Sequence, residues 1–303
     1  MIHIIIFSFN RALQLDALLS SIQKYWINIS HHVTILYNTT DNSYQKGYNI
    51  LKQKYPTYSF TKETIGNYKY PIKNYISFFN LKKLIRYKKC RVQKSNFREL
   101  LNQIIAQSND DYIMFLTDDS IFINKVNIDN KLLLWISSSP QNNSFSLRLG
   151  RHINTPSKPL KIDEDIINWK YSDYKSFKNW GYPFSVDGHI YSKIIIKQLL
   201  NKIIFNNPST LEAHVYDYVQ KHGLLNIGKT SVSPFLLSYP LNMVQTMVDN
   251  ESLNISPNKL NNYLLQGYNL YYPIPEEITT FQQYPNEVYL KKNTDTITLK
   301  ASL

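Results

Sequence analysis

Two adjacent carboxylates follow a strongly apolar run in the middle of the chain. The stretch YIMFLTDDSIF, residues 112–122, begins as a buried strand would and then places Asp118 beside Asp119. Ionised carboxylates are costly to bury without partners, and adjacent ones repel each other. A divalent cation bound to phosphate oxygens would resolve both problems, whereas a turn exposed to solvent is the simpler alternative. The pair alone does not decide between these interpretations.

The segments around this pair alternate between predicted strands and helices. Four apolar runs predict strands, at residues 3–9, 32–38, 57–63 and 111–116. Three segments with helical spacing predict helices, after Asn10, over residues 43–55 and from Phe97 to Ile105. We therefore expect an α/β fold with a mostly parallel, Rossmann-like sheet flanked by helices.

Similar polar residues follow the other predicted strands. In an open parallel sheet, ligands gather at the carboxyl ends of the strands, where the strand order reverses. The polar side chains at these ends follow the first strand (Ser8, Asn10, Arg11), the second (Asn38, Asp41) and the fourth (Asp118, Asp119). This coincidence favours a binding site over an isolated turn.

The second half of the chain is less regular. It contains a predicted strand at residues 144–150, a buried helix at 194–204 and a C-terminal hairpin at 287–299. A further helix should begin with Asn207 as its cap and Pro208 in its first position. Without an internal repeat or a Gly-, Pro- or Ser-rich linker, we expect one domain over residues 1–303, with halves at 1–125 and 126–303.

The overall composition favours partners that carry negative charge. The net charge is +12, and basic residues crowd between Lys62 and Arg98. Nucleic acid, anionic lipid and phosphorylated small molecules all fit such a charge. The single cysteine, the missing signal peptide and the lack of a long apolar segment predict a cytoplasmic protein.

Three segments together resemble a known enzyme family. The succession IIIFSFNRALQLDALLSSI, VTILYNTTDNSYQKGYNILKQKYP and YIMFLTDDSIF resembles bacterial and viral glycosyltransferases of the GT-A fold. The resemblance covers about the first 125 residues well and implies transfer of a sugar from a nucleotide-diphosphate sugar to a glycan or lipid-linked acceptor in polysaccharide biosynthesis. The family's acidic DxD motif reads TDD here, because Thr117 stands in its first position.

The resemblance assigns roles to the polar residues of the first half. It implies that Asp119 coordinates Mn²⁺ or Mg²⁺ bound to the donor diphosphate, while Asp118 orients the ribose or the waters of the metal. Hard cations favour such carboxylate oxygens. The residues implied to contact the nucleotide are Ser8, Asn10 and Asp41 near the base or ribose, and Arg11 and Arg148 near the phosphates. Capping of the following helix is the alternative for Asn10, and solvation for Arg148 or its neighbour Arg151.

The second half should supply the acceptor site. An inverting transferase needs a general base, for which Glu212 is the first candidate and Asp187 the second. The alternative for Glu212 is a surface charge that the start of a helix favours, and the alternative for Asp187 is an ordinary Asp-Gly turn. Three aromatic residues suit either stacking on sugar rings or packing of a loop: Trp180, Tyr182 and Phe184. The chain lacks the late histidine that many such enzymes give to the metal, so Asn242 or Gln245 takes that place in our interpretation, with His189 and His214 as scaffold.

Two other function classes remain open at this stage. The basic, tyrosine-rich segment permits a nucleic-acid binder, but no zinc-ligand array, helix-turn-helix or RNP-like motif supports it, so no nucleic-acid partner is expected. A metal-dependent nucleotidyltransferase would keep the fold, although a Gly-rich phosphate loop is missing. Under the transferase interpretation, the basic segment either rests peripherally on an anionic membrane or forms a solvated cationic surface.

Overall fold

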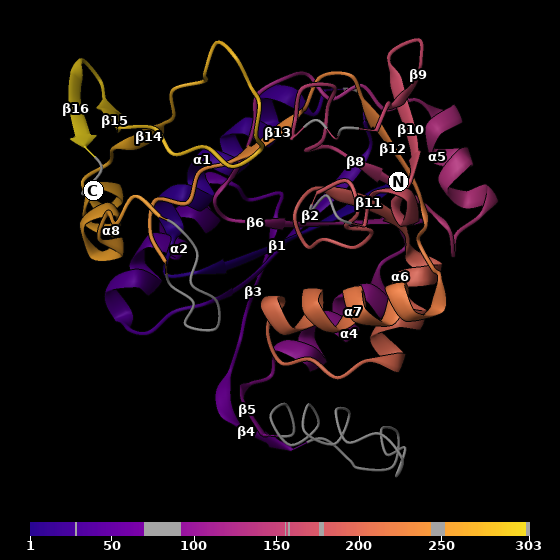
Figure 1. The fold of residues 1–303 in the computed structure, drawn as a ribbon. Helices are drawn as coiled ribbons and strands as arrows, with labels where there is room; N and C mark the ends of the chain where they lie inside the picture. The colour runs from indigo at the N-terminus through magenta and orange to yellow at the C-terminus, as the bar shows by residue number, and fades with distance from the viewer. Residues whose placement is uncertain are drawn as a thin grey trace.

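A nine-stranded sheet runs through the protein (Figure 1). The computed structural model describes residues 1–27, 29–69, 92–154, 156, 158–175, 179–243 and 252–300. The strand order is β3-β2-β1-β6-β11-β8-β12-β10-β9. Residues 70–91, which hold most of the basic segment, lie outside the described part, as does Gln245.

The first half of the chain forms the parallel part of this sheet. Strand β1 (Ile2–Phe9) pairs in parallel with β2 (His31–Asn38) and β6 (Tyr112–Thr117), and β2 pairs in parallel with β3 (Ser59–Lys62). Strand β1 is buried almost throughout because its IHIIIF run is covered on both faces. The predicted α/β class and its parallel strands are confirmed.

The second half extends the same sheet with mixed pairing. Strand β11 (His189–Ser192) is antiparallel to both β6 and β8 (Asn143–Ser146). Strand β12 (Ile227–Ser231) is parallel to β8, and β10 (Ile166–Lys170) and β9 (Lys161–Asp163) continue in antiparallel order. The segment that holds Trp180, Tyr182 and Phe184, which we expected to be a loop, therefore leads into a central strand, β11.

Helices cover both faces of the sheet, as predicted. One face packs on α1 (Ala12–Tyr25), α2 (Asn42–Lys54), α5 (Asn130–Ser138) and α8 (Pro257–Leu265). The other packs on α4 (Phe97–Gln107), α6 (Lys193–Lys202) and α7 (Pro208–His222). The predicted cap of α7 is confirmed, since Asn207 Oδ1 accepts a hydrogen bond from the backbone N–H of Thr210.

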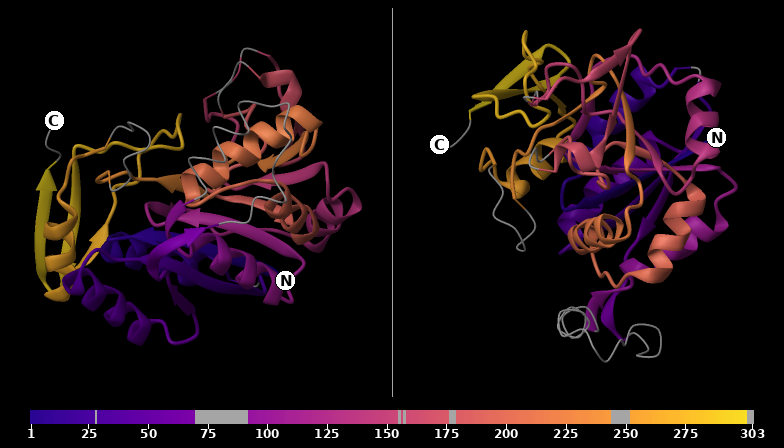
Figure 2. Two further views of the ribbon diagram at one scale, coloured as in Figure 1. Left: turned by 90° about the horizontal axis from the view of Figure 1, so that it is seen from below. Right: turned by 45° about the vertical axis from the view of Figure 1, so that its right-hand side comes forward.

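Three small sheets and one short helix complete the described structure. The two-stranded sheets are β7 (Ser120–Phe122) with β13 (Leu236–Ser238), and β4 (Ile65–Lys69) with β5 (Val92–Ser95). The C-terminal sheet joins β14 (Asn269–Tyr271), β15 (Glu287–Lys292) and β16 (Asp295–Lys300), which confirms the predicted hairpin, and lies beside α8 (Figure 2). The 3₁₀ helix η2 spans Tyr171–Tyr174. Among the described helices, none has the length and apolar character needed to span a membrane.

Candidate functional site

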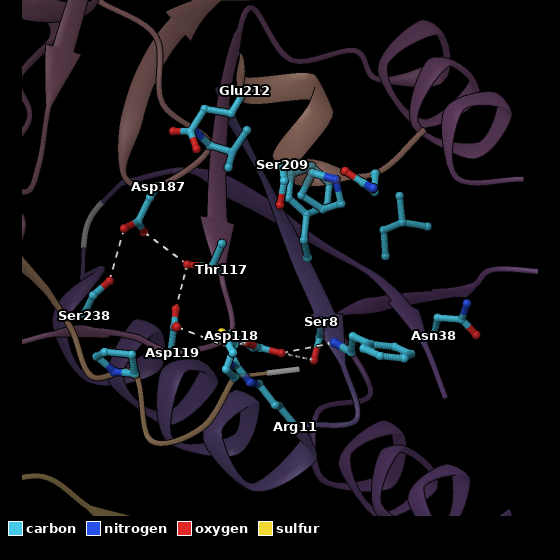
Figure 3. Close-up of a pocket in the computed structure, with 18 of the residues that line it drawn as sticks. Ser8, Arg11, Asn38, Thr117, Asp118, Asp119, Asp187, Ser209, Glu212 and Ser238 are labelled. Atoms are coloured by element: carbon cyan, nitrogen blue, oxygen red, sulfur yellow. Dashed lines mark hydrogen bonds and ion pairs between the residues drawn. The ribbon is translucent and has the colours of Figure 1, made fainter. Parts of the chain in front are cut away.

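A cavity of about 700 Å³ lies at the carboxyl ends of β1, β2 and β6 (Figure 3). Its volume suits a small-molecule ligand. Most of the residues singled out in the sequence line it: Ser8, Arg11, Asp118, Asp119, Arg148, Asp187 and Glu212. The parallel register, in which Phe7 lies opposite Thr117, brings the ends of β1 and β6 together.

Asp118 is buried on the floor of this cavity and fully engaged by neighbours. Its Oδ2 accepts hydrogen bonds from the Ser8 hydroxyl at 2.7 Å and from the Phe9 backbone N–H at 3.2 Å. Its Oδ1 lies 3.0 Å from Nη1 of Arg11. Burial, opposed by Arg11 and reinforced by the Asp119 charge, raises the pKa of Asp118 to about 6. Both of its oxygens already have partners, so Asp118 acts as an anchor for Arg11 and β1.

Arg11 joins the two aspartates through one nitrogen. Its Nη1 lies 3.0 Å from Asp118 Oδ1 and 3.2 Å from Asp119 Oδ2. Its Nε donates to Asn242 Oδ1 at 2.7 Å, and its Nη2 donates to the Asn242 carbonyl oxygen. A cation is normally unfavourable at a helix N-terminus. Here the two carboxylates offset that cost at the start of α1.

Asp119 and Asp187 approach each other across Thr117. The Thr117 hydroxyl donates to Asp119 Oδ1 at 2.8 Å and lies 3.4 Å from Asp187 Oδ1. Asp187 also accepts hydrogen bonds from the hydroxyls of Ser120 at 2.6 Å and Ser238 at 3.1 Å. The Asp119 side chain keeps 17% of its surface exposed and faces the cavity.

Glu212 and Arg148 form the far wall, beyond Asp187. The Val186 backbone N–H donates to Glu212 Oε1 at 3.2 Å, and burial raises the pKa of Glu212. Glu212 lies in the second turn of α7, so the alternative of a charge at the helix start does not apply to it. Arg148 lies 3.5 Å from Asp187 Oδ2 and stacks 4.3 Å from the centre of the Phe281 ring. It therefore stands beside Asp187 and not beside the Asp118–Asp119 pair.

The structure does not bring Asn10 and Asp41 to the wall of the cavity. Asn10 has φ 56° and exchanges hydrogen bonds with Thr40, so it neither caps α1 with its side chain nor faces the cavity. Asp41 is exposed and caps α2 by accepting from the backbone N–H groups of Ser43 and Tyr44. Both side chains are occupied in shaping the loop after β2.

The aromatic residues divide between core and cavity. Trp180 is fully buried, with its indole N–H donating to the Ile153 carbonyl oxygen at 2.9 Å, and Phe184 is buried against α4, α6 and α7. Tyr182 lines the cavity and stacks on Tyr216. The stacking interpretation is therefore wrong for Trp180 and Phe184, because packing of an irregular segment consumes both.

The histidines expected to be scaffold are placed as such. His189 is fully buried in β11, and burial lowers its pKa well below the ordinary value. His214 contacts the Ile204 carbonyl oxygen. The late residue Asn242 lies at the cavity, where its side chain and backbone hold Arg11.

Glu63 lines the cavity but was not predicted as a site residue. It follows β3 directly, and its Oε2 lies 3.4 Å from the Asn38 amide nitrogen. The signal that identified Asp118, a polar residue at the end of a predicted strand, applies equally to Glu63. Ser238 was also missed, because its proximity to Asp187 depends on the β7–β13 pairing.

The charges around the cavity fit a divalent cation that enters with an anionic ligand. Five carboxylates line it, against two guanidinium groups, among the residues described. Each oxygen of Asp119 has one hydrogen-bond or ion-pair partner, and 17% of the side chain stays exposed, whereas Asp118 has three such partners and only 4% exposure. The described part of the chain has no group of three or more His, Cys, Asp or Glu side chains arranged for a metal. Mg²⁺ is commonly held by one or two carboxylates together with substrate phosphates and water. Asp119 fits such a site.

The sequence is similar to that of a known glycosyltransferase. The chain is 22% identical over 242 residues to the bifunctional glycosyltransferase pgtA of Dictyostelium discoideum, an alignment that includes 70% of this chain. The chain spans 27% of the length of that relative. No protein-family model matches the sequence. The resemblance to glycosyltransferases noted in the sequence is thus confirmed by a named enzyme.

Three solved structures of S. aureus TarS are among those similar to this chain. Three TarS structures align at a TM-score of 0.44 with 10%, 13% and 15% identity, and each covers 78% of this chain. The alignments cover 36%, 60% and 59% of the respective TarS chains. The third of these structures is a complex of TarS with UDP.

Proposed function

We propose that the protein is a metal-dependent, inverting glycosyltransferase that uses a nucleotide-diphosphate sugar as donor and a glycan or lipid-linked molecule as acceptor. The observation that carries this proposal is the position of Asp119, whose carboxylate is steadied by Arg11 and Thr117 and still faces the cavity. Similarity to the Dictyostelium glycosyltransferase supports sugar transfer as the reaction class.

Electrostatics supports a requirement for metal. A diphosphate entering a cavity with more carboxylates than guanidinium groups would be repelled unless a cation accompanied it. Asp119 would hold Mn²⁺ or Mg²⁺, and Asp118 would keep Arg11 in place beside it. When bound, the metal would neutralise charge on the leaving diphosphate. Arg11 adds a fixed positive charge at the same point.

Glu212 is the better placed general base. Burial raises its pKa, and a more basic carboxylate accepts a proton from an acceptor hydroxyl more readily. Asp187 already accepts hydrogen bonds from the hydroxyls of Ser120 and Ser238, so its oxygens are engaged by the protein. We assign Asp187, together with Arg148, to holding the donor sugar or the acceptor.

The proposal includes a membrane contact through the basic residues between Lys62 and Arg98. Its motivation is the charge of that segment and the lipid-linked class of acceptor. Vesicles that contain anionic lipid should bind the protein at low salt and release it at high salt, while neutral vesicles should not bind it. Absence of binding to anionic vesicles at low salt would remove this part of the proposal.

Calorimetric titration with UDP, GDP and dTDP, each with and without Mn²⁺, tests the main proposal. One nucleotide should bind in a Mn²⁺-dependent manner, and Asp119→Ala should abolish that dependence. Asp111→Asn is the matched control, because Asp111 lies at the opposite end of β6 with 75% of its side chain exposed. Failure of every nucleotide to bind the folded wild-type protein would overturn the proposal.

A further inference from the structure

One end of the cavity has no role in the chemistry proposed above. Asp187 and Glu212 lie at one end, Ser8, Arg11 and Asp118 lie in the middle, and Asn38 lies at the other end (Figure 3). Sugar transfer would occupy the first end and the diphosphate the middle. The remaining end, at the carboxyl ends of β2 and β3, is therefore where the base of the nucleotide would lie.

The walls of this end suit a flat ring. Leu36 and Phe97 line it and are almost fully buried, and Phe7 and Phe9 line the cavity beside them. The polar groups that line the cavity on this side include the Asn38 amide, the Ser95 hydroxyl and the Glu63 carboxylate. Apolar walls with a small number of convergent polar groups are typical of specific ligand pockets.

Glu63 is held firmly at this end. Its backbone N–H donates to the Tyr37 carbonyl oxygen at 2.8 Å, which extends the ladder between β2 and β3. The next residue, Thr64, exchanges hydrogen bonds with Asn96 at 2.7 and 3.2 Å. The Glu63 carboxylate accepts hydrogen bonds from Asn38 and Ser95, which offset part of its burial. Its position is thus set before any ligand arrives.

The nucleobases differ in what they offer to a carboxylate. Guanine presents N1–H and the 2-amino group side by side, two donors that match the two carboxylate oxygens. Uracil and thymine present a single N–H between two carbonyl oxygens, so one carboxylate oxygen finds a donor and the other meets a carbonyl oxygen. Adenine and cytosine place a ring-nitrogen acceptor beside their amino group.

We propose that Glu63 reads the paired donors of guanine, so that the sugar donor is a guanosine-diphosphate sugar. This inference rests on the proposed transferase function and adds its nucleotide. A site whose groups are placed to hydrogen-bond a ligand N–H discriminates against analogues that lack that N–H.

The test uses GDP, IDP, UDP and dTDP with Mn²⁺ on the full chain. IDP differs from GDP only by lacking the 2-amino group, so the ratio of the two affinities isolates that contact. We expect GDP to bind about tenfold more tightly than IDP, and more tightly than UDP or dTDP. In Glu63→Gln the GDP affinity should fall by about tenfold or more and the GDP/IDP ratio should approach one. Glu276→Gln, at an exposed position away from the cavity, should leave both affinities unchanged.

The possible results separate this inference from the proposed function. Tighter binding of UDP or dTDP than of GDP would overturn the guanine assignment and leave the transferase proposal intact. A GDP/IDP ratio that is unchanged in a folded Glu63→Gln protein would show that another group reads the 2-amino group. No binding of any nucleotide by wild type would overturn both. If the variant does not fold, the wild-type order of the four nucleotides still decides.

Discussion

The hydroxyl of Thr117 lies between the carboxylates of Asp119 and Asp187, at 2.8 and 3.4 Å from their nearest oxygens. A single atom therefore links the carboxylate that we propose for the metal to the one that we propose for the donor sugar or acceptor. A carboxylate at this position, as in a full DxD motif, would place three anionic groups within a few ångströms of one another. Thr117 therefore stands where a DxD motif has its first aspartate, and Asp187 places a carboxylate 3.4 Å from its hydroxyl.

Removing this hydroxyl should weaken the site without unfolding the protein. Thr117→Val keeps the shape of the side chain but takes a hydrogen-bond donor from Asp119, at a cost of about 1 kcal/mol in free energy of unfolding. Mn²⁺-dependent nucleotide affinity should fall several-fold by calorimetry. Thr117→Ser retains the hydroxyl and should bind nucleotide as wild type does. Equal affinities for the Val and Ser variants would show that the hydroxyl does not position Asp119.

Replacing Arg11 should produce a pH-dependent loss of stability. Arg11→Met leaves Asp118 and Asp119 without their cation, and loss of one partner from a buried ion pair costs about 3–5 kcal/mol. The folded-state pKa of Asp118, already raised to about 6, should rise further above its unfolded value. The folded state then binds more protons than the unfolded one, so stability falls as pH rises from about 4 through the folded pKa.

Urea unfolding of Arg11→Met at pH 5 and pH 8 checks this sign. The deficit relative to wild type should be smaller at pH 5, where Asp118 is protonated and uncharged. Adding Asp118→Asn to Arg11→Met should recover stability at pH 8. A deficit that is equal at both pH values would mean that lost packing and not charge explains the effect.

Glu212 should govern the acid side of the pH–rate profile. A general base acts when unprotonated, so kcat/KM should rise with pH and level off above the raised pKa of Glu212, beyond the ordinary range near pH 4.3. Glu212→Gln should lower kcat by about 10²- to 10⁴-fold and leave the donor KM within a few-fold. If Asp187→Asn alone gives that pattern, the roles of the two carboxylates are reversed.

Substitutions at Trp180 and Tyr182 should affect different properties, the first the stability of the fold and the second the binding of ligand. Trp180→Phe removes a buried indole and its hydrogen bond to the Ile153 carbonyl oxygen, so it should cost about 1–3 kcal/mol in free energy of unfolding with unchanged KM. Tyr182→Ala changes the cavity wall and should raise KM for donor or acceptor. Thermal unfolding and steady-state kinetics measure the two effects. A raised KM in Trp180→Phe would contradict its assignment to the core.

Much of the first half was predictable because its signals are local. The continuous apolar run of β1 and the helical spacing of α1 each indicate one element, and the parallel order then places Ser8, Arg11 and Asp118 at one edge. The insertion of β11 beside β6 was not predictable, because it pairs residues about 75 positions apart and its sequence, HIYS, is short.

The predicted site succeeded or failed for similar reasons. Polar residues at strand ends reached the cavity when the strand direction carried them there, as with Asp118 and Glu63. Asp41 and Asn10 did not, because each meets an immediate backbone or side-chain neighbour that uses its hydrogen bonds. The amino-acid sequence shows which side chains are polar, but it does not show which of them form hydrogen bonds with a nearby residue instead of facing the cavity.

The pairing of β11 with β6 connects the two halves of the chain through backbone hydrogen bonds. Gly188, next to Asp187, donates its backbone N–H to the Phe115 carbonyl oxygen at 2.9 Å, so the acceptor side is bonded to the strand that ends in the TDD motif. The two halves of the chain share one sheet, so the backbone hydrogen bonds between β6 and β11 would have to break before the halves could separate. A fragment that ends near residue 125 would lack β11 and leave one edge of β6 unpaired, which favours aggregation.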